Sequence, residues 1–302
     1  IFKLGEILDE PMADASIIPT YLLSRFTREY VTVALGGDGG DELFAGYPTF
    51  PAHRLAGFYE YLPRFLHEKL IKKLADYLPV STSNISFDFK VKQFLSGVYH
   101  SPEIRNELWL GAFSSVQLKS LLSPEIASQL KDFNPFAEML TVLEPLDAKD
   151  WLEKIIHLYI RFYFQNGILV KIDRASMASS LEVRAPFLDP EFVELIGSIP
   201  GNLKLKGLTT KYILKKSLEP VLPGEIIYRD KKGFGIPIAR WIKEDLRDLF
   251  LDIFSQSNIQ SQGFFKFSTV ENLMMEHLQG KRDNRKKLWT LFMFQLWYQN
   301  WF

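Results

Sequence analysis

The chain has 302 residues, of which 47% are hydrophobic and 24% are charged, as in an ordinary globular protein. Its 36 basic and 36 acidic residues cancel to a formal net charge of zero, which argues against a nucleic-acid-binding protein. The lack of cysteine excludes disulfides, thiolate zinc sites and cysteine nucleophiles within these residues. No apolar run reaches the roughly 20 residues that span a membrane, and no stretch has the layout of a signal peptide. We therefore expect a cytoplasmic protein without membrane contact.

The first 50 residues indicate part of an α/β structure. A helix is expected over residues 18–28, with Pro19 suited to its first turn. Residues 31–35 form a β-branched, uncharged run that ends in glycines, which predicts a buried parallel strand. A glycine-rich turn follows, and a short helix is expected to start at Asp41. One strand needs partners for its backbone groups, so we expect further strands and a natural protein that continues upstream of Ile1.

The residues after position 50 predict helices, because apolar residues recur there at three- and four-residue spacing and prolines mark the joints. The predicted helices cover residues 64–77, 148–164, 190–199, 209–218 and 270–278. Loops are expected at 81–84 and 131–135. The aromatic stretch over 288–298 is either a membrane or partner surface or a buried C-terminal helix, and its polar breaks favour the buried helix.

The glycine-rich turn has a composition that suggests a ligand. It reads Gly36-Gly37-Asp38-Gly39-Gly40-Asp41-Glu42 and follows the predicted strand. Glycines let a backbone approach a ligand closely, and a turn that leads into a helix N-terminus favours phosphates. The three acids would repel a phosphate unless a cation such as Mg²⁺ bridges them. A magnesium–polyphosphate site is one interpretation, and a structural Asp-Gly turn is the other. The turn fits neither the P-loop nor the dinucleotide motif.

Two pairs of opposite charges occur beside apolar segments. Asp173-Arg174 and Glu182-x-Arg184 are interpreted as partly buried ion pairs that hold a loop against the core, or, for Arg184, as a grip on a substrate carboxylate. Lys231, taken alone, is a solvated loop residue. The five histidines show no metal-ligand spacing and are interpreted as structural or surface residues. They are His53, His67, His100, His157 and His277.

Four ordered blocks of the sequence resemble asparagine synthetases of the glutamine-hydrolysing type. The first runs from Leu8 to Asp14 and continues over Ile18 to Ser24. It resumes at Val33 and passes through the glycine-rich turn at residues 36–42, the glycine loop, to Tyr47. The others are Leu169-Val170-Lys171-Ile172-Asp173-Arg174-Ala175-Ser176-Met177, Leu181-Glu182-Val183-Arg184-Ala185-Pro186-Phe187-Leu188-Asp189 and Arg229-Asp230-Lys231-Lys232-Gly233-Phe234-Gly235. Residues 51–146 carry no block that matches.

The resemblance implies a fold and a reaction. The fold would be mainly α with a small parallel β remnant, the C-terminal part of an α/β adenine-nucleotide hydrolase-like (PP-loop ATP pyrophosphatase) synthetase domain. Residues 1–50 would end its parallel-sheet ATP-binding region, and residues 51–302 would be its helical part. The enzyme would adenylate the side-chain carboxylate of aspartate with ATP. Ammonia from an N-terminal glutaminase would then displace AMP, which gives asparagine, AMP and pyrophosphate.

The resemblance also implies roles for individual residues. The ATP and pyrophosphate contacts would come from Gly36, Gly37, Gly39, Gly40 and Lys231. Asp41 would hold Mg²⁺, while Asp38 and Lys231 would act on the acyl-adenylate and its phosphates. Asp14, Ser16 and Arg184 would lie near the acceptor, although an N-cap role explains Ser16 equally well.

The chain departs from the family pattern in three ways. The pyrophosphate loop Ser-Gly-Gly-x-Asp-Ser and the glutaminase half are not among these residues, so we expect this fragment alone to be inactive. Gly36 also stands where the family usually has serine. Two alternatives stay open: a relative with another acceptor, such as a sugar, peptide or antibiotic precursor, and a non-catalytic module on the same fold. The oligomeric state, with a homodimer among the options, is not fixed by the sequence.

Overall fold

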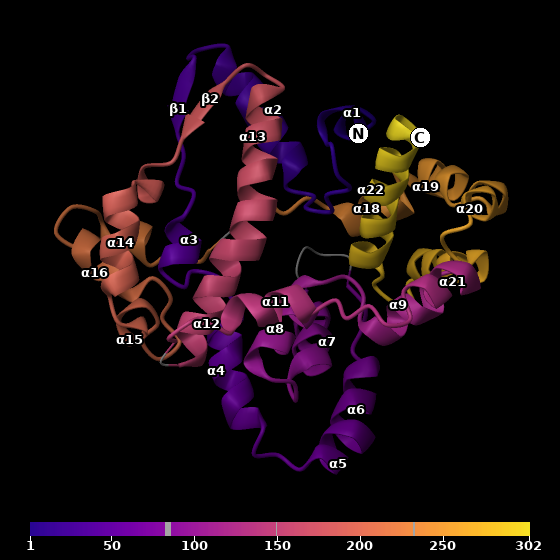
Figure 1. Ribbon diagram of the computed structural model, residues 1–302, viewed down its shortest axis with the longest axis horizontal. Helices are drawn as coiled ribbons and strands as arrows, with labels where there is room; N and C mark the ends of the chain where they lie inside the picture. The colour runs from indigo at the N-terminus through magenta and orange to yellow at the C-terminus, as the bar shows by residue number, and fades with distance from the viewer. Residues whose placement is uncertain (82–85, 149, 232) are drawn as a thin grey trace.

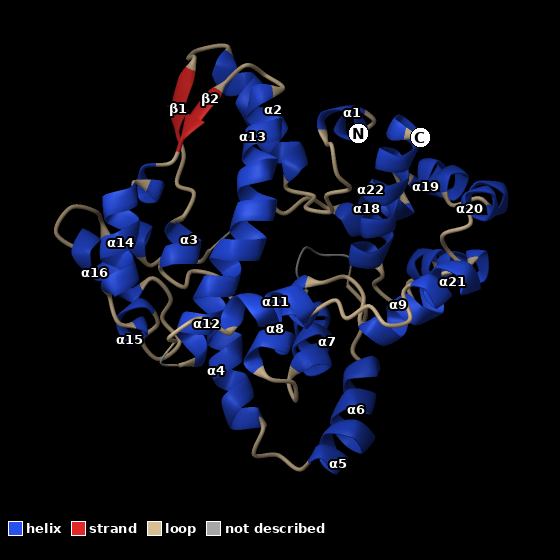
Figure 2. Ribbon diagram, in the orientation of Figure 1, coloured by secondary structure: helices blue, strands red, loops and turns tan. Residues whose placement is uncertain are grey.

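The computed structural model describes residues 1–81, 86–148, 150–231 and 233–302. Helices dominate this part of the chain, and two short strands pair at one edge of the molecule (Figure 2). Most of the loop predicted at 81–84 lies outside the described residues, whereas residues 131–135 form turns and loop as expected. Among the described residues, every helix is too short or too polar to cross a bilayer.

A continuous helical rod runs through the centre of the molecule (Figure 1). It consists of α12 (Trp151–Leu158), the π-helical η2 (Tyr159–Leu169) and α13 (Val170–Met177). Asp150 caps its start, because the side-chain oxygen accepts hydrogen bonds from the amides of Leu152 and Glu153 at 2.9 and 3.1 Å. The helix predicted over 148–164 is therefore present, but its predicted end is too early, because the rod continues to Met177. A π-helix widens the turn, so its apolar residues leave the 3.6-residue period by which we identified helices.

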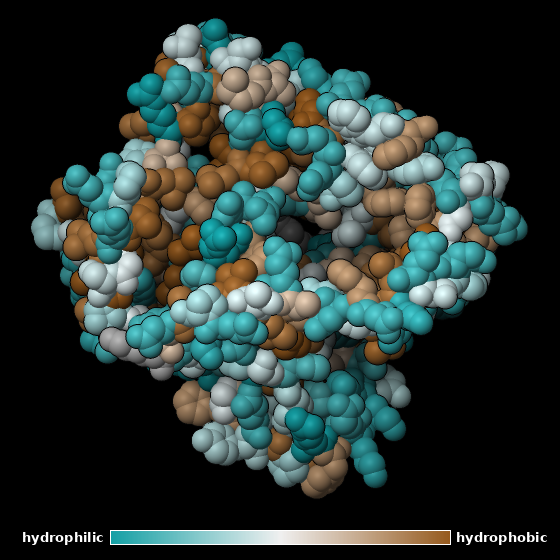
Figure 3. Space-filling view, in the orientation of Figure 1, coloured by the Kyte–Doolittle hydropathy of each residue, from teal (hydrophilic) through white to brown (hydrophobic). Residues whose placement is uncertain are grey.

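The sheet consists of β1 (Val33–Leu35) and β2 (Glu182–Arg184), which pair in parallel with Val33 opposite Glu182. The parallel strand was predicted, but its burial was wrong: the exposed fractions are 39% for Val33 and 74% for Leu35. Apolar side chains gather on the side of the molecule that carries the sheet and α14 (Figure 3). β2 lies where helices alone were expected, and it was not predicted because a three-residue strand with two charged ends has no strand pattern.

Short helices surround the loop that follows β1, on the side of the molecule that carries α14 and α16 (Figure 1). They are α3 (Gly40–Leu43), η3 (Pro186–Leu188), α14 (Pro190–Ser198), α15 (Gly201–Lys204), α16 (Tyr212–Leu218) and α17 (Gly224–Ile227). Leu43 and Phe44 pack there against Ile196. The helix predicted over 190–199 is confirmed. The one predicted over 209–218 starts at Tyr212 instead, since Lys211 has a φ of +52°, which a helix cannot include.

A second group of helices lies around the lower end of the rod in Figure 1, with α9 farther to the right. It comprises α4 (Thr49–Tyr59), α5 (Arg64–Leu66), η1 (His67–Ile71), α6 (Lys72–Asp76), α7 (Phe87–Gly97), α8 (Pro102–Leu110), α9 (Ser115–Leu121), α10 (Pro124–Gln129) and α11 (Ala137–Leu143). The helix predicted over 64–77 is confirmed as the run α5, η1 and α6. Phe50 of α4 packs on Ile155 and Tyr159 of the rod, and all three are fully buried.

The third group joins the two ends of the chain. It contains α1 (Lys3–Ile7), α2 (Ile17–Arg28), α18 (Ile238–Lys243), α19 (Arg247–Ile253), α20 (Gln256–Gln262), α21 (Phe267–Leu278) and α22 (Arg285–Trp301). The helices predicted at 18–28 and 270–278 are confirmed. The aromatic stretch over 288–298 is the predicted buried helix, because Leu288, Phe292 and Leu296 face the core. The two termini lie near each other (Figure 1), and Trp301 Nε1 donates to the Leu8 carbonyl at 3.2 Å.

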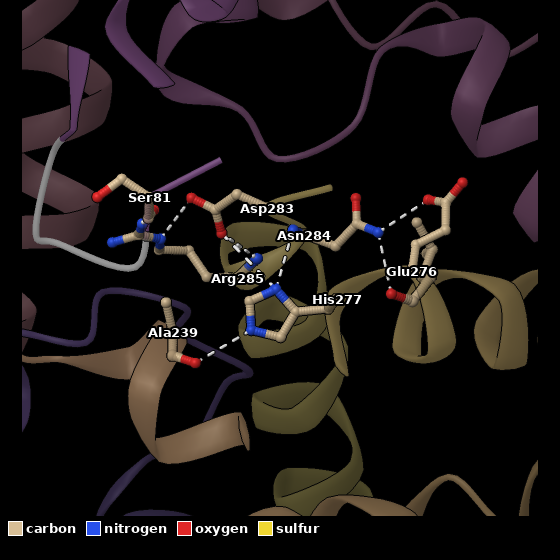
Figure 4. A network of polar contacts seen from close by, with 8 residues as sticks. Ser81, Ala239, Glu276, His277, Asp283, Asn284 and Arg285 are labelled. Carbon is tan, nitrogen blue, oxygen red and sulfur yellow. Dashed lines mark hydrogen bonds and ion pairs between the residues drawn. The ribbon is translucent and has the colours of Figure 1, made fainter. Parts of the chain in front are cut away.

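A buried polar network ties α21 to α18 and α22 (Figure 4). His277 Nδ1 accepts a hydrogen bond from the Asn284 amide at 3.2 Å, and its Nε2 lies 3.2 Å from the Ala239 carbonyl oxygen. These partners require a neutral ring with the proton on Nε2. Asp283 pairs with Arg285 at 2.7 Å beside it. Burial lowers the pKa of His277, although Ala239 and Asp283 oppose the shift.

Candidate functional site

The glycine loop continues the sheet before it turns. The amide of Gly36 donates to the Arg184 carbonyl at 2.7 Å, which extends the ladder by one residue beyond β1. Gly39 has a φ of +93°, and a Cβ there would lie 2.7 Å from the Leu188 side chain. Only glycine fits this position. A Cβ at Gly37 would meet no atom within 4 Å, so the backbone is open to a ligand at that point.

The structure gives a physical reason for glycine at position 36. A Cβ at this position would lie 2.5 Å from Asp38 Oδ2 and 3.3 Å from a methyl group of Val183. The lack of a side chain therefore lets the Asp38 carboxylate fold against the backbone of the loop. Serine at position 36 would require this flexible carboxylate to move, while the backbone path could remain.

Asp41 lies between two lysines from distant parts of the chain. Its Oδ1 is 2.8 Å from Lys211 Nζ and its Oδ2 is 2.8 Å from Lys231 Nζ. Burial alone would raise the pKa of Asp41, but the hydrogen bonds and charges of the two lysines outweigh burial and lower it. One carboxylate thus holds two ammonium groups beside the glycine loop.

Tyr47 and Glu42 form the wall next to Lys231. The Lys231 ammonium lies 4.2 Å from the centre of the Tyr47 ring, within cation–π range. The Tyr47 hydroxyl donates to Glu42 Oε1 at 2.5 Å. Glu42 is buried, and burial raises its pKa despite the hydrogen bond from Tyr47. Tyr47 therefore positions both the ammonium and the carboxylate.

A tight return of the chain brings Lys211 to Asp41. The Gly46 amide donates to the Asp41 carbonyl at 2.7 Å, and the Lys211 amide donates to the Phe44 carbonyl at 3.1 Å. Ala45 and Lys211 both have φ values of +52°. Non-glycine residues in this conformation are uncommon and are held by their surroundings.

A second polar cluster joins α2 to the rod. The buried Lys171 ammonium lies 3.1 Å from Asp14 Oδ2 and 2.8 Å from Ser16 Oγ. Burial raises the pKa of Asp38, and the charge of Lys171 opposes this shift. Tyr163, on the rod, is close to both clusters. Burial is the main cause that raises the pKa of its hydroxyl, and the charges of Asp14, Glu42 and Asp41 add to the shift.

The structure brings together most of the predicted site residues. The four glycines, Asp38, Asp41 and Lys231 lie around the glycine loop, and Asp14 and Ser16 meet at Lys171. Ser16 occupies the N-cap position of α2, but its side chain accepts no capping hydrogen bond from the helix backbone. The N-cap interpretation of this side chain is therefore wrong.

The two predicted ion pairs exist but are more exposed than expected. Arg184 pairs with Glu182 at 2.6 Å on an exposed face of β2. Arg174 lies 3.6 Å from Asp173 and makes a closer, two-point contact with Asp9, at 2.6 and 3.1 Å. Partial burial is wrong for Glu182 and Arg184, which are both exposed, whereas Arg174 is half-buried beside an exposed Asp173.

Sequence reasoning missed three residues of the site. Lys211 lies outside all four blocks, about 170 positions from its partner Asp41, so no local signal could reveal it. Lys171 was inside a block, and a charged residue between Val170 and Ile172 was a usable signal of a buried pair. Tyr47 ends the first block, and nothing in its position there indicates the contact with Lys231.

A possible metal ligand set can be judged from its donors. Among the residues that the structure describes, no three His, Cys, Asp or Glu side chains meet as a metal site would require. Mg²⁺ that arrives on ATP needs fewer protein ligands, since phosphate oxygens and water supply the rest. Asp41 is a candidate ligand for such an ion, and both of its carboxylate oxygens also lie 2.8 Å from lysine ammonium groups.

Comparison with known proteins agrees with these observations. The family "Asparagine synthase" matches residues 1–299. A putative glutamine-hydrolysing asparagine synthetase of Mycobacterium tuberculosis is 31% identical over 96% of this chain and 43% of its own length. Asparagine synthetase (glutamine-hydrolysing) 1 of Bacillus subtilis is 30% identical over 96% of this chain and 44% of its own length. A more distant match, "Amidase chyE" of Penicillium rubens, is 23% identical over 80% of this chain and 37% of its own length.

The chain thus spans less than half the length of these curated relatives. The match nevertheless extends over almost all of its residues, including the glycine loop and the segments that supply Lys171, Lys211 and Lys231. The chain belongs to the asparagine synthase family.

Proposed function

We propose that this chain is the synthetase part of an enzyme that uses ATP and ammonia from glutamine to convert the side-chain carboxylate of aspartate to an amide. Residues 1–50 would be the end of its parallel-sheet ATP-binding region, of the PP-loop type, and residues 51–302 its helical part. The observation that carries the proposal is Asp41 held between Lys211 and Lys231 beside the glycine loop. A bare structural turn has no need of two converging lysines.

The lysines suit the departure of pyrophosphate. In the first step an oxygen of the acceptor carboxylate forms a bond to the α-phosphorus of ATP, and the bond from that phosphorus to the β-bridging oxygen breaks. Negative charge collects on the leaving pyrophosphate, and ammonium groups placed beforehand stabilise it. Lys211 and Lys231 are held in place by Asp41 before the nucleotide arrives, so little reorganisation is needed.

Asp41 would also contact the Mg²⁺ that accompanies ATP. The ion would neutralise charge on the phosphate oxygens. The carboxylate stays ionised because the two lysines lower its pKa, which suits a metal ligand. Gly37, with open space beside it, and its neighbours in the loop would bring backbone amides toward the phosphates.

Asp38 suits the second step. Ammonia attacks the acyl carbon of the adenylate, the bond to AMP breaks, and the nitrogen must lose a proton. A partly buried carboxylate with a raised pKa is a better proton acceptor than an ordinary one. We assign this role to Asp38, and we assign the acceptor end of the site to Asp14, Ser16 and Lys171. Of the residues assigned to the acceptor, Arg184 contributes least to binding, since its exposed side chain forms an ion pair with Glu182.

Pyrophosphate exchange into ATP tests the proposal on the natural full-length protein. With aspartate present, Lys231→Ala and Lys211→Ala should each lower the exchange rate by roughly 100-fold or more, as loss of one transition-state donor does. Lys119→Ala on the exposed face of α9 is the matched control and should leave the rate unchanged. Exchange that survives both site substitutions would contradict the assignment of the phosphate site.

The acceptor is tested in the same assay. We expect exchange that depends on aspartate and formation of asparagine when glutamine is added. Another acceptor has one specific argument in its favour, the similarity to a protein named an amidase. If exchange requires a different carboxylate, the ligase chemistry stands and aspartate is replaced. If Mg-ATP does not bind at millimolar concentration, the non-catalytic alternative is correct.

The 302 residues by themselves should not catalyse this exchange. The sequence Ser-Gly-Gly-x-Asp-Ser, by which the family binds pyrophosphate, does not occur among them. We expect no aspartate-dependent exchange from the isolated chain at concentrations at which the full-length protein reacts readily. Measurable exchange would mean that the glycine loop and the lysines suffice.

A further inference from the structure

A cavity of about 840 Å³ opens where α4 ends, away from the residues assigned above. Its walls are the last turns of α4, the segment from Glu60 to Arg64 that leads into α5, and the turn from Tyr99 to Pro102 that leads into α8. None of the residues around the glycine loop or Lys171 lines it. The volume falls within the range of small-molecule sites, about 300–1,000 Å³.

Among the residues that the structure describes, three arginines and a single acid line the cavity. The arginines are Arg54, Arg64 and Arg105, and the acid is Glu60. Arg105 is 2% exposed; it contacts Glu60 and donates to the His100 carbonyl at 2.9 Å. Its Nε has no hydrogen-bond partner among the described residues. The lining therefore carries an uncompensated positive charge.

The other two arginines form no ion pair with any residue that the structure describes. Glu68 lies one helical turn beyond Arg64, but its carboxylate pairs with Lys72 at 2.9 Å. The Arg64 guanidinium instead lies 5.3 Å from the centre of the Tyr99 ring. Such arginines beside a concave surface are suited to a phosphate, which a guanidinium can bind with two parallel hydrogen bonds.

Aromatic side chains form the rim of the same cavity. Tyr61 is 88% exposed and Phe58 is 69% exposed, while Trp151 and Tyr99 line the wall. Large aromatic faces left in water beside a cavity are suited to a flat ring, which stacks on them and removes apolar surface from water. Arginines and aromatic rings together favour a ligand with a planar ring and an acid group.

We propose that this cavity binds a mononucleotide, with the phosphate at the arginines and the base on the aromatic rim. The site is separate from the glycine loop, although α4 connects them. Thr49, in the first turn of α4, forms a hydrogen bond with Tyr159, whose ring stacks on Tyr47. His53 and Phe58 of the same helix line the cavity. A nucleotide bound here would contact the far end of a helix that begins at the candidate active site.

Calorimetric titration of the full-length protein with AMP and GMP tests the proposal. Either nucleotide should bind, and Arg64→Ala and Tyr61→Ala should each weaken binding by roughly tenfold, as expected for loss of a charged hydrogen bond and of a stacked base. Both positions are exposed, so the variants should fold. Adenosine and inorganic phosphate, which each present half of the ligand, should bind at least about tenfold more weakly than AMP.

Matched substitutions far from the cavity serve as controls. Arg247→Ala on α19 and Tyr77→Ala after α6 remove the same groups from positions outside the cavity lining and should leave binding unchanged. The proposal is wrong if neither nucleotide binds at millimolar concentration, or if either rim variant binds as the unaltered protein does. It is also wrong if phosphate alone binds as tightly as AMP, since the rim would then contribute nothing.

Discussion

Gly46 leaves no room for a side chain at the point where Asp41 meets Lys211. A Cβ would lie 2.9 Å from the Asp41 Cα, and it would be closer still to Asp41 Oδ1 and Lys211 Cε. Backbone as well as side chains must move to admit it. We expect Gly46→Ala to lower the free energy of unfolding by about 2 kcal/mol, in line with other overpacked sites. Urea unfolding measures this effect.

The control is a glycine with open space around it. Gly197 lies in α14, and a Cβ there would meet nothing within 4 Å. Gly197→Ala should leave stability unchanged or raise it by up to about 1 kcal/mol, because alanine favours helix. Equal losses at both positions would mean that the close approach at Gly46 does not matter.

At the scale of single residues, the sequence could predict the parts of the site that lie on contiguous motifs. Asp41 and Lys231 were singled out, and the structure brings them to 2.8 Å. Lys211 could not be found, since its place depends on how the chain returns past Phe44. Lys171 could have been found only by asking why a lysine stands in an apolar run.

At the scale of elements, Tyr159 links the rod to the start of α4. Its buried hydroxyl lies 2.5 Å from Thr49 Oγ1, and its ring stacks on Tyr47 with centres 4.8 Å apart. Tyr159→Phe keeps the stack and leaves Thr49 without this partner. We expect a loss of about 1 kcal/mol in the free energy of unfolding. Urea unfolding of the variant checks the value.

Tyr77→Phe is the matched control, because Tyr77 is 85% exposed and its hydroxyl has no hydrogen bond within the described residues. Its stability should stay within about 0.5 kcal/mol of the unaltered chain. A Tyr159→Phe variant that is equally stable would show that the contact between α4 and η2 rests on ring packing alone.

Helices were easier to predict than strands here for a physical reason. An amphipathic helix such as α14 shows its period within one segment, whereas β1 and β2 are three residues each and depend on one another across almost 150 positions. The prediction ended too early in the π-helical η2 for another reason, because the wider turn of a π-helix breaks the apolar period by which a helix is identified.

At the scale of the whole molecule, buried neutral histidines link stability to pH. The pKa of His277 is lowered from its ordinary 6.5 by burial, with Lys243 and Arg285 adding to the shift and Asp283 opposing it. At His277, the unfolded chain therefore binds more protons than the folded chain below about pH 6.5. Its unfolding free energy should fall as the pH drops through this range, with a slope of at most about 1.4 kcal/mol per pH unit.

His277→Asn should reduce this dependence between pH 7.5 and pH 5, as followed by urea unfolding at each pH. The comparison must be with the unaltered chain, because His53, whose pKa burial lowers to about 3, adds to the slope, and Glu107, whose pKa burial raises, opposes it. Gln279→Ala, at an exposed position near His277 that carries no titratable group, should keep the original slope. An unchanged slope in His277→Asn would rule out its contribution.

The central rod has a consequence for how the chain length can change. Tyr159, Tyr163 and Lys171 lie on one unbroken helix, and each meets a partner from a different element. A substitution along the rod alters one of these contacts. Insertion or deletion of a single residue within η2 would instead turn everything beyond it by roughly 100°, one residue's rotation in an α-helix. Lys171 would then lose its contact with Asp14, while Tyr159 would keep its contact with Thr49. The number of residues between these two positions therefore matters more for aligning the two polar clusters than the identity of those residues.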